Sequence, residues 1–247
     1  MKTLDLSFSD PVLNLACDEV LLDEVDGGQR EPTLRFWESP NLFVVVGYGN
    51  EIIKECQVQE CQKLDIPIFR RTSGGGTILQ GPGCLNYSLI LRIDENCETK
   101  NIGSTNCHIM KTNRDALGQA LGESVEIEGH TDLTIDGVKF SGNAQRRRRN
   151  ALLFHGTFLL DFDLALIAQA LRMPSAEPNY RGGRPHESFC RNIPLTADTI
   201  KQALGQAWQT LGESSPIDIS KIQRLAKTKY GCPDWIHRRT KSSQSSE

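Results

Sequence analysis

Hydrophobic and polar positions along the chain change their spacing several times, and each spacing predicts a type of element. Residues 11–24 predict a helix, because Asp10 can accept a first-turn N–H group and Pro11 has no N–H group to leave unpaired. Residues 33–37 and 43–47 are short β-rich runs that turn formers separate, and we expect them to pair with each other as strands.

The rest of the chain continues this mixture of helices and strands. A helix is expected over residues 51–64, strands over 66–70 and 85–92, and a helix from Ser104 or Thr105 to about Gly122. Strands joined by tight turns follow over 125–127, 132–135, 138–144 and 151–160, with Asp136-Gly137 as a hairpin signal. The remaining helices are expected over 164–171, 197–211 and 218–228, and residues 174–194 form a loop rich in glycine, proline and arginine.

The composition is typical of one globular domain. The chain has 247 residues, a formal charge of -3 and 38% hydrophobic residues, without a repeat or an abrupt change in composition. We therefore predict a single α+β domain, a mixed β-sheet packed with helices, over residues 1–240, with a helical C-terminal part from about residue 196. Residues 241–247 are polar and are expected to form a disordered tail.

Charge, hydrophobic run length and cysteine content indicate the cellular location and the classes of partner that we expect. The near-neutral charge excludes the broad cationic field of a nucleic-acid-binding protein. The longest aliphatic run, residues 42–46, is too short to cross a membrane, and acidic residues near the N-terminus do not fit a signal peptide. Eight cysteines without a CxxC pair are typical of reduced thiols. We expect a cytoplasmic protein with no nucleic-acid partner and no membrane partner.

Three consecutive glycines follow the strand expected over residues 66–70. Gly74, Gly75 and Gly76 allow backbone N–H groups to approach a ligand closely. Arg70 and Arg71 precede them and carry donors suited to phosphate or carboxylate oxygens. The pattern is neither a Walker loop nor a dinucleotide-binding fingerprint. It indicates an anion-binding loop, and the structural alternative is a flexible glycine hairpin with solvated arginines.

A lysine and a histidine occur on two successive predicted strands. Lys139 has small neighbours, Ser141 and Gly142, that leave space for a ligand, although a lysine on a strand is more often solvated. No acidic residue occurs between residues 136 and 161, so the local field is positive. His155 is either a hydrogen-bonded packing residue or a proton-transfer group.

Taken in order along the chain, these motifs resemble the lipoate-protein ligase A family over roughly residues 10–195. The matching motifs are Arg70-Arg71-x-Ser73-Gly74-Gly75-Gly76, Asp132-Leu133 with Gly137-x-Lys139-x-Ser141-Gly142-x-Ala144, and His155-Gly156-Thr157. The resemblance implies a biotin/lipoate-protein ligase catalytic-domain fold. It also implies an enzyme that activates lipoate or octanoate with ATP and transfers the acyl group to a lysine of a lipoyl-carrier domain.

The resemblance further implies roles for individual residues. Lys139 matches the lysine that contacts both nucleotide and lipoate, and it is the expected catalytic residue. The residues expected to bind ATP are Arg71, Gly76, Thr77, Ile78, Leu79 and Lys139. Those expected to bind lipoate are Lys139, Ser73, Gly74, Gly75 and His155. Neighbours carried over from the same motifs are Arg70, Asn86, Asp132, Ser141 and Gly142.

Activation of a carboxylate by ATP is consistent with these residue types. Cations and N–H donors neutralise the charge that develops at the α-phosphate and carboxyl oxygens, and Lys139 is the residue expected to do so. Mg²⁺ is expected on the phosphate oxygens, without a metal ligand that the sequence identifies. The acyl-adenylate hydrolyses easily, so we expect a closed and partly apolar tunnel. The acceptor is expected to be an acidic lipoyl domain.

Departures from the family pattern leave other functions open. Family members that act alone commonly carry a C-terminal accessory domain, so a separate accessory subunit is one expectation. Related octanoyl- and lipoyl-transferases use a cysteine thioester instead of ATP, and Cys84, Cys190 and the segment around His130 keep that reaction open. Buried free cysteines are the structural alternative. Residues 146–149, four arginines, would suit a non-catalytic ligase-like binding protein, but no aromatic residues for base stacking accompany them.

Overall fold

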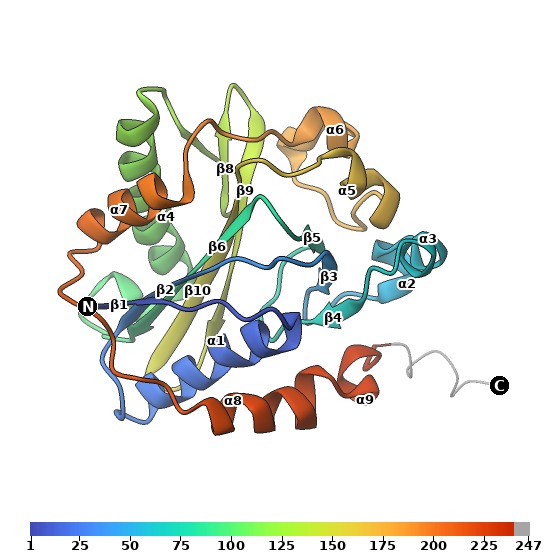
Figure 1. Ribbon diagram of the computed structural model, residues 1–247. Coiled ribbons are helices and arrows are strands. Elements are labelled where there is room, and N and C mark those ends of the chain that lie inside the picture. The colour runs from blue at the N-terminus through green and yellow to red at the C-terminus, as the bar shows by residue number, and fades with distance from the viewer. Residues whose placement is uncertain (240–247) are drawn as a thin grey trace.

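A seven-stranded mixed sheet forms the centre of the molecule (Figure 1). The computed structural model describes residues 1–239, so the tail expected over 241–247 lies outside the described residues. β1 pairs with β2 in parallel, and the other neighbours in the sheet are antiparallel. In spatial order the strands are β1 (Lys2–Asp5), β2 (Thr33–Trp37), β6 (Cys84–Arg92), β10 (Ala151–Leu159), β9 (Val138–Arg147), β8 (Asp132–Ile135) and β7 (Glu126–Glu128).

A second, three-stranded sheet lies beside the first. It consists of β4 (Ile68–Arg70), β3 (Phe43–Val46) and β5 (Ile78–Gln80), with β3 in the middle. The expected pairing of residues 33–37 with 43–47 is therefore wrong. Both edges of β2 are already occupied, by β1 and by β6, so the chain after β2 crosses to the other sheet.

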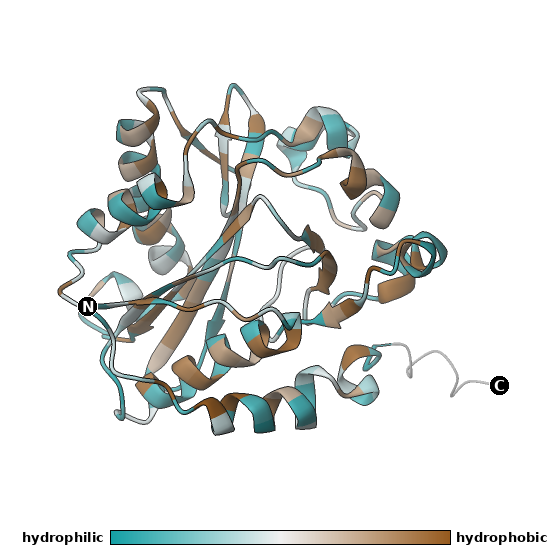
Figure 2. Ribbon diagram, in the orientation of Figure 1, coloured by the Kyte–Doolittle hydropathy of each residue, from teal (hydrophilic) through white to brown (hydrophobic). Residues whose placement is uncertain are grey.

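Helices cover both faces of the large sheet. On one face lie α4 (Ile102–Leu121) and α7 (Ala197–Ala207), over a core that includes Phe154 and Phe158. On the other face lies α1 (Pro11–Asp26), and Figure 1 shows α8 (Ile219–Leu225) running alongside it. Figure 2 shows hydrophobic residues along the inner strands, whereas α8 is mostly hydrophilic. The mixed α+β fold that the sequence predicts is confirmed.

Short helices lie near the smaller sheet. Two of them take the place of one long helix that the sequence predicts. The expected helix over 51–64 is interrupted, because Cys56 is extended and pairs with Leu171, and the N–H group of Gln57 donates to the carbonyl of Ala170. The short elements in this region are α2 (Ile52–Glu55), α3 (Val58–Lys63), α5 (Ala165–Ala170), η2 (Asn179–Arg181) and α6 (His186–Phe189).

The bounds of α4 show which side chain caps it. The side chain of Asn101 accepts from the N–H group of Ser104 at 2.9 Å, so the helix begins before the expected caps, Ser104 and Thr105. Gly122 adopts a φ of 68° and ends the helix, as the sequence predicts. The sequence did not predict β1, β5 or the short elements η1 (Glu98–Lys100) and α9 (Pro233–Ile236).

The C-terminal segment is anchored to both α1 and the smaller sheet. It comprises α8, η3 (Ala226–Tyr230) and α9. Glu19 of α1 is buried and accepts from the Tyr230 hydroxyl at 2.7 Å and pairs with Lys229. The indole N–H of Trp235 donates to the carbonyl of Arg70 at 2.9 Å. Within residues 1–239, no helix combines the length and the apolar composition that crossing a membrane requires.

Candidate active site

A cavity of about 620 Å³ opens over one face of the large sheet, between this face and the smaller sheet. The strand register explains why the expected polar residues gather there. Gly142 lies opposite Thr157, and Thr157 lies opposite Asn86, so these three positions share one face of the sheet. His155 belongs to the same face because it lies two residues from Thr157.

A β-bulge directs Lys139 to this face. Ser141 pairs with Leu133, but Lys139 pairs with Thr134, so Phe140 is an extra residue in β9. The Lys139 ammonium forms an ion pair with Asp132 at 2.8 Å. A Cβ atom on Gly142 would lie 2.7 Å from Nζ of Lys139, so the space that Gly142 provides holds the lysine itself.

The ion pair contacts residues of the loop region over 174–194, which supplies part of the cavity lining. The hydroxyl of Tyr180, in η2, donates to Oδ2 of Asp132 at 2.7 Å. Phe189, in α6, lies beneath the ammonium of Lys139, with 5.9 Å from Nζ to the ring centroid. Among residues 1–239, no three His, Cys, Asp or Glu side chains gather in a way that could hold a metal ion.

The glycine run forms a tight turn that Arg71 holds in place. Gly75 has a φ of 82°, and a Cβ atom on Gly47 would lie 2.1 Å from the Gly75 carbonyl oxygen. The guanidinium of Arg71 donates to the carbonyls of Gly74 and Gly76 and to Oγ of Ser73. Burial lowers the pKa of Arg71 to about 10. Arg71 reaches the cavity with these donors already directed to the turn.

Arg70 has a structural role that the sequence did not predict. Its side chain is fully buried and does not line the cavity. Nη1 donates to the carbonyls of Gly47 and Asn50 at 2.7 Å each, and Nε donates to that of Ile236 at 2.8 Å. The expected pair of arginines open to an anion is therefore wrong for Arg70, because its side chain is buried outside the cavity lining.

His155 connects the glycine turn to a buried ion pair. Its Nε2 lies 2.6 Å from Oγ of Ser73, and its Nδ1 lies 3.8 Å from Oδ2 of Asp18. Asp18 pairs with Arg35 at 2.6 Å. Burial favours a higher pKa for Asp18, but the charge of Arg35 and the nearby imidazole of His155 outweigh it, and the pKa is lowered.

Most of the expected site residues line the cavity. The residues that do so are Arg71, Gly75, Gly76, Thr77, Ile78, Leu79, Asn86, Asp132, Lys139, Ser141, Gly142 and His155. Arg70, Ser73 and Gly74 do not, and Ser73 contacts the lining residues Arg71 and His155 from behind the cavity wall. Sequence reasoning gave no binding role to several lining residues, including Trp37, Gln80, Asn143, Thr157 and Arg181. A correct strand register would have indicated Trp37 and Thr157, since each lies opposite Asn86.

The cysteines named in the sequence differ in their access to the site. Cys190 lines the cavity and forms a parallel bridge with Lys139, and the next residue donates its N–H group to the Lys139 carbonyl at 2.8 Å. Burial raises the pKa of the Cys190 thiol, although Lys139 and Arg181 oppose the shift. Cys84 is fully buried in β6 outside the lining, and burial raises its pKa to about 12. His130 lies in the lining.

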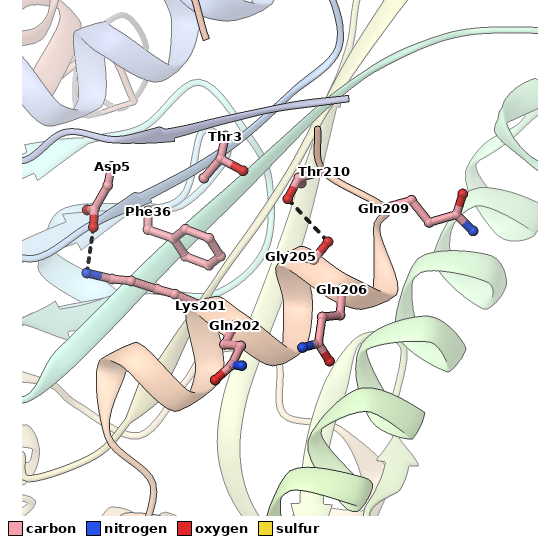
Figure 3. A pocket seen from close by; sticks show the side chains of 9 residues that line it. All are labelled: Thr3, Asp5, Phe36, Lys201, Gln202, Gly205, Gln206, Gln209 and Thr210. Atoms are coloured by element: carbon pink, nitrogen blue, oxygen red, sulfur yellow. Dashed lines mark hydrogen bonds and ion pairs between the residues drawn. The ribbon is translucent and has the colours of Figure 1, made fainter. Parts of the chain in front are cut away.

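A second cavity of about 360 Å³ lies near the N-terminal strand, against α7 (Figure 3). The charged residues that line it, Asp5 and Lys201, pair with each other at 2.9 Å. Three glutamines and two threonines supply most of its remaining polar groups. This cavity has neither a surplus charge nor a nucleophile, so the larger cavity is the candidate active site.

The larger cavity combines an apolar part with a cationic part. Leu15, Trp37 and Val45 belong to its apolar wall, whereas Lys139 and Arg181 bring positive charge. Such a cavity is suited to a molecule with an apolar chain and an anionic end, since each part meets its complement.

The chain belongs to the lipoyl protein ligase A/B catalytic domain family, and the sequence model of that family matches residues 10–209. It is 30% identical over 235 residues to a probable lipoate-protein ligase A of Mycoplasma pneumoniae, covering 91% of this chain and 68% of that protein. It is 27% identical over 274 residues to the octanoyltransferase LipM of Moorella thermoacetica, covering 96% and 98%. A bi-partite lipoate protein ligase from Thermoplasma acidophilum has the same fold, with a TM-score of 0.82, 22% identity and coverage of 96% and 95%.

Proposed function

We propose that the protein is a lipoate-protein ligase that uses MgATP. The observation that carries the proposal is the cavity itself, which brings the Asp132-held ammonium of Lys139 and the glycine turn to one space with an apolar wall. A carboxylate and a triphosphate are both anions, so the site that joins them needs fixed positive charge and N–H donors. The apolar wall accommodates the dithiolane chain of lipoate.

The proposed reaction has two steps. A carboxylate oxygen of lipoate attacks the α-phosphorus of ATP, the bond from this phosphorus to the pyrophosphate oxygen breaks, and pyrophosphate leaves. The amine of an acceptor lysine then attacks the carbonyl carbon of lipoyl-adenylate, loses a proton and expels AMP. Enclosure protects the adenylate from water between the two steps.

Each group of site residues has a proposed task in these steps. Lys139 neutralises the charge that builds up on the α-phosphate and carboxyl oxygens, and Asp132 holds it in place until the substrates arrive. Arg71 with residues 76–79 contacts the nucleotide, and Gly75 with His155 contacts lipoate. Ser73 and Gly74 act behind the cavity wall by fixing the turn.

The proposed domain organisation follows from the fold. We propose that residues 1–240 form one catalytic domain, whose helical part from about 196 packs on both faces of the sheet. The acceptor is a lipoyl domain. A separate accessory subunit assists the first step, because the Thermoplasma acidophilum chain of the same fold is part of a ligase described as bi-partite.

The alternative is an octanoyl- or lipoyltransferase that forms a thioester on Cys190 without ATP. It is favoured by the position of Cys190 next to Lys139 in the cavity, and by the nearly full-length match to the Moorella octanoyltransferase. Burial opposes it, because the raised pKa keeps Cys190 in the thiol form, whereas the thiolate is the nucleophile.

Lipoate-dependent exchange of labelled pyrophosphate into ATP tests the proposal. The ligase predicts exchange, with the protein alone or with its accessory subunit, only when lipoate is present. Omitting lipoate and replacing Lys139 by Ala are the two controls, and both are expected to abolish exchange. Absence of exchange, together with acyl transfer from an octanoyl-carrier protein, selects the transferase.

A further inference from the structure

The loop region over residues 174–194, which supplies part of the cavity lining, carries a buried arginine, Arg181. It is the last residue of η2, is 4% exposed and lines the cavity. Burial lowers the pKa of its guanidinium, but an arginine with an ordinary value of 12.5 remains a cation at neutral pH. A charge in such a position has to be balanced by a partner or by a ligand.

The guanidinium of Arg181 has few partners within the described residues. Nε donates to the carbonyl of Arg184 at 2.9 Å, and Nη2 contacts Sδ of Met173 at 3.4 Å. Within residues 1–239, Nη1 has no hydrogen-bond partner, and the one carboxylate within 4 Å is Glu177, at 3.8 Å. The side chain of Glu177 is 39% exposed, so water screens this pair.

The other cations near the site have their partners within the protein. All three guanidinium nitrogens of Arg71 donate to backbone carbonyls or to a serine hydroxyl, and Lys139 is paired with Asp132. Arg70 donates from Nε and Nη1 to backbone carbonyls and lies outside the cavity lining, although its Nη2 has no hydrogen-bond partner among the described residues. Of the cations named here, Arg181 is therefore the one that lines the cavity and has a guanidinium nitrogen without a hydrogen-bond partner among residues 1–239.

Arg181 is also held in a fixed place close to Lys139. Its guanidinium carbon lies 4.4 Å from the centroid of the Phe189 ring, and Nζ of Lys139 lies 5.9 Å from the same centroid. The preceding residue, Tyr180, bonds to Asp132, the partner of Lys139. Two cations from different elements therefore approach one part of the cavity, and the rigid ring limits their movement.

We propose that Arg181 binds the phosphate oxygens of ATP, an inference that rests on the proposed ligase function. A guanidinium presents planar N–H donors that suit phosphate oxygens, and the free Nη1 provides such a donor. In this arrangement Lys139 serves the reacting carboxyl and α-phosphate groups, and Arg181 supplies the anion-binding charge that the sequence motif led us to expect from Arg70.

Isothermal titration of the full chain with MgATP, and separately with lipoate, tests this inference. Arg181→Gln is expected to raise the Kd for MgATP about tenfold or more, since it removes a charge-assisted hydrogen bond. Arg181→Lys keeps the positive charge but loses the planar set of guanidinium N–H donors. Its Kd for MgATP is therefore expected to lie between those of Arg181→Gln and the wild type. The Kd for lipoate is expected to stay unchanged in both variants.

Arg191→Gln is the matched control, because it removes an arginine in the same segment whose side chain does not line the cavity. Its Kd for MgATP is expected to equal that of the wild type. The Tm of each variant without ligand, within about 3 °C of the wild type, shows that the fold is intact. Arg181→Lys, which keeps the buried stem and charge, provides the test if Arg181→Gln does not fold.

Two outcomes overturn the assignment while the proposed function stands. One is an unchanged Kd for MgATP in the Arg181 variants, and the other is a loss of lipoate binding alone, which would make Arg181 a carboxylate-binding residue. A wild-type protein that binds lipoate but not MgATP, both alone and with its accessory subunit, contradicts the ligase function itself, and with it the ligand assigned to Arg181.

Discussion

Lys139 owes its orientation to one extra residue in β9. Without the bulge at Phe140, Lys139 would alternate onto the same face as Ser141, opposite to the face that Gly142 shares with its partner Asp132. The bulge places the ammonium next to Asp132, and the missing side chain of Gly142 gives it room. The local backbone geometry thus supports the role that we propose for this lysine.

Lys139→Ala is expected to lower the rate of acyl transfer at least a hundredfold, because it removes the charge that faces the developing anions. The substitution removes a partly exposed side chain, so the far-UV circular dichroism and the Tm are expected to remain close to those of the wild type. Lys111→Ala, at an exposed position of α4, is the control. Full activity of Lys139→Ala would remove the lysine from the proposed mechanism.

Cys190 is expected to behave as a buried thiol. Its raised pKa means that the thiolate fraction is small at pH 7–8 and grows only at higher pH, so iodoacetamide is expected to alkylate it more slowly than free cysteine. Cys190→Ser is expected to retain activity. Rapid alkylation at neutral pH, or an acyl group trapped on Cys190, would contradict this prediction.

The sequence motifs predicted which residues line the cavity better than they predicted the contacts of those residues. Lys139 and His155 line the cavity as expected, because their strands alternate onto one face once the bulge is included. The acceptors of Arg70 include the carbonyls of Asn50 and Ile236, which are 20 and 166 residues away in the chain. Such long-range partners leave no local pattern, so a motif alone could not show that Arg70 is structural.

At the scale of elements, the C-terminal segment supports the glycine turn from outside. Trp235 of α9 donates to the carbonyl of Arg70, and Arg70 donates back to the carbonyl of Ile236. Arg70 ends β4, directly before the turn. The position of the turn therefore depends on residues that lie far beyond the motif in the sequence.

Trp235→Phe is expected to lower the Tm by about 2–4 °C, since it removes one hydrogen bond worth about 1 kcal/mol from a chain of this size. It is also expected to speed amide hydrogen exchange in residues 68–76. Trp208→Phe removes a comparable indole hydrogen bond, to Asn113 on the other face of the sheet, and serves as the control. Equal exchange of residues 68–76 in both variants would contradict the proposed support.

Local patterns predicted the long elements well and the short ones poorly. The helix from Pro11 and the strand from Ala151 begin where the sequence indicates, because caps and turn residues mark their ends. The helix expected over 51–64 breaks at Cys56, where pairing with Leu171 outweighs helix propensity. Strand partners depend on which sheet edges are free, and this information is absent from either strand alone.

At the scale of the whole molecule, buried charges join the layers. Arg35 of β2 is fully buried and pairs with Asp18 of α1, which also accepts from Ser88 of β6 at 2.8 Å. His155 connects this cluster to the glycine turn. Helix, sheet and turn are therefore coupled, and loss of one charge is expected to affect the stability of the entire domain.

Asp18→Asn is expected to reduce the free energy of unfolding by about 3 kcal/mol at pH 7, because it leaves Arg35 without its counter-charge. The pKa of Asp18 is lower in the folded state than its ordinary value of 3.8. Its stabilising effect is thus present above about pH 4 and is lost as the pH falls through the folded pKa. Urea unfolding from pH 7 to pH 3 is expected to show this loss in the wild type and less of it in Asp18→Asn. Equal pH dependence of the two proteins would contradict this account.

The central claim is that the cavity holds an acyl-adenylate against Lys139 and the glycine turn. The most direct test offers the protein lipoyl-adenylate and, in parallel, an octanoyl-carrier thioester, with a lipoyl domain as acceptor, and measures intact masses. We predict acylation of the lipoyl domain from the adenylate, none from the thioester, and no change in the mass of the protein itself. Transfer from the thioester alone, with an acyl group on Cys190, would contradict the claim.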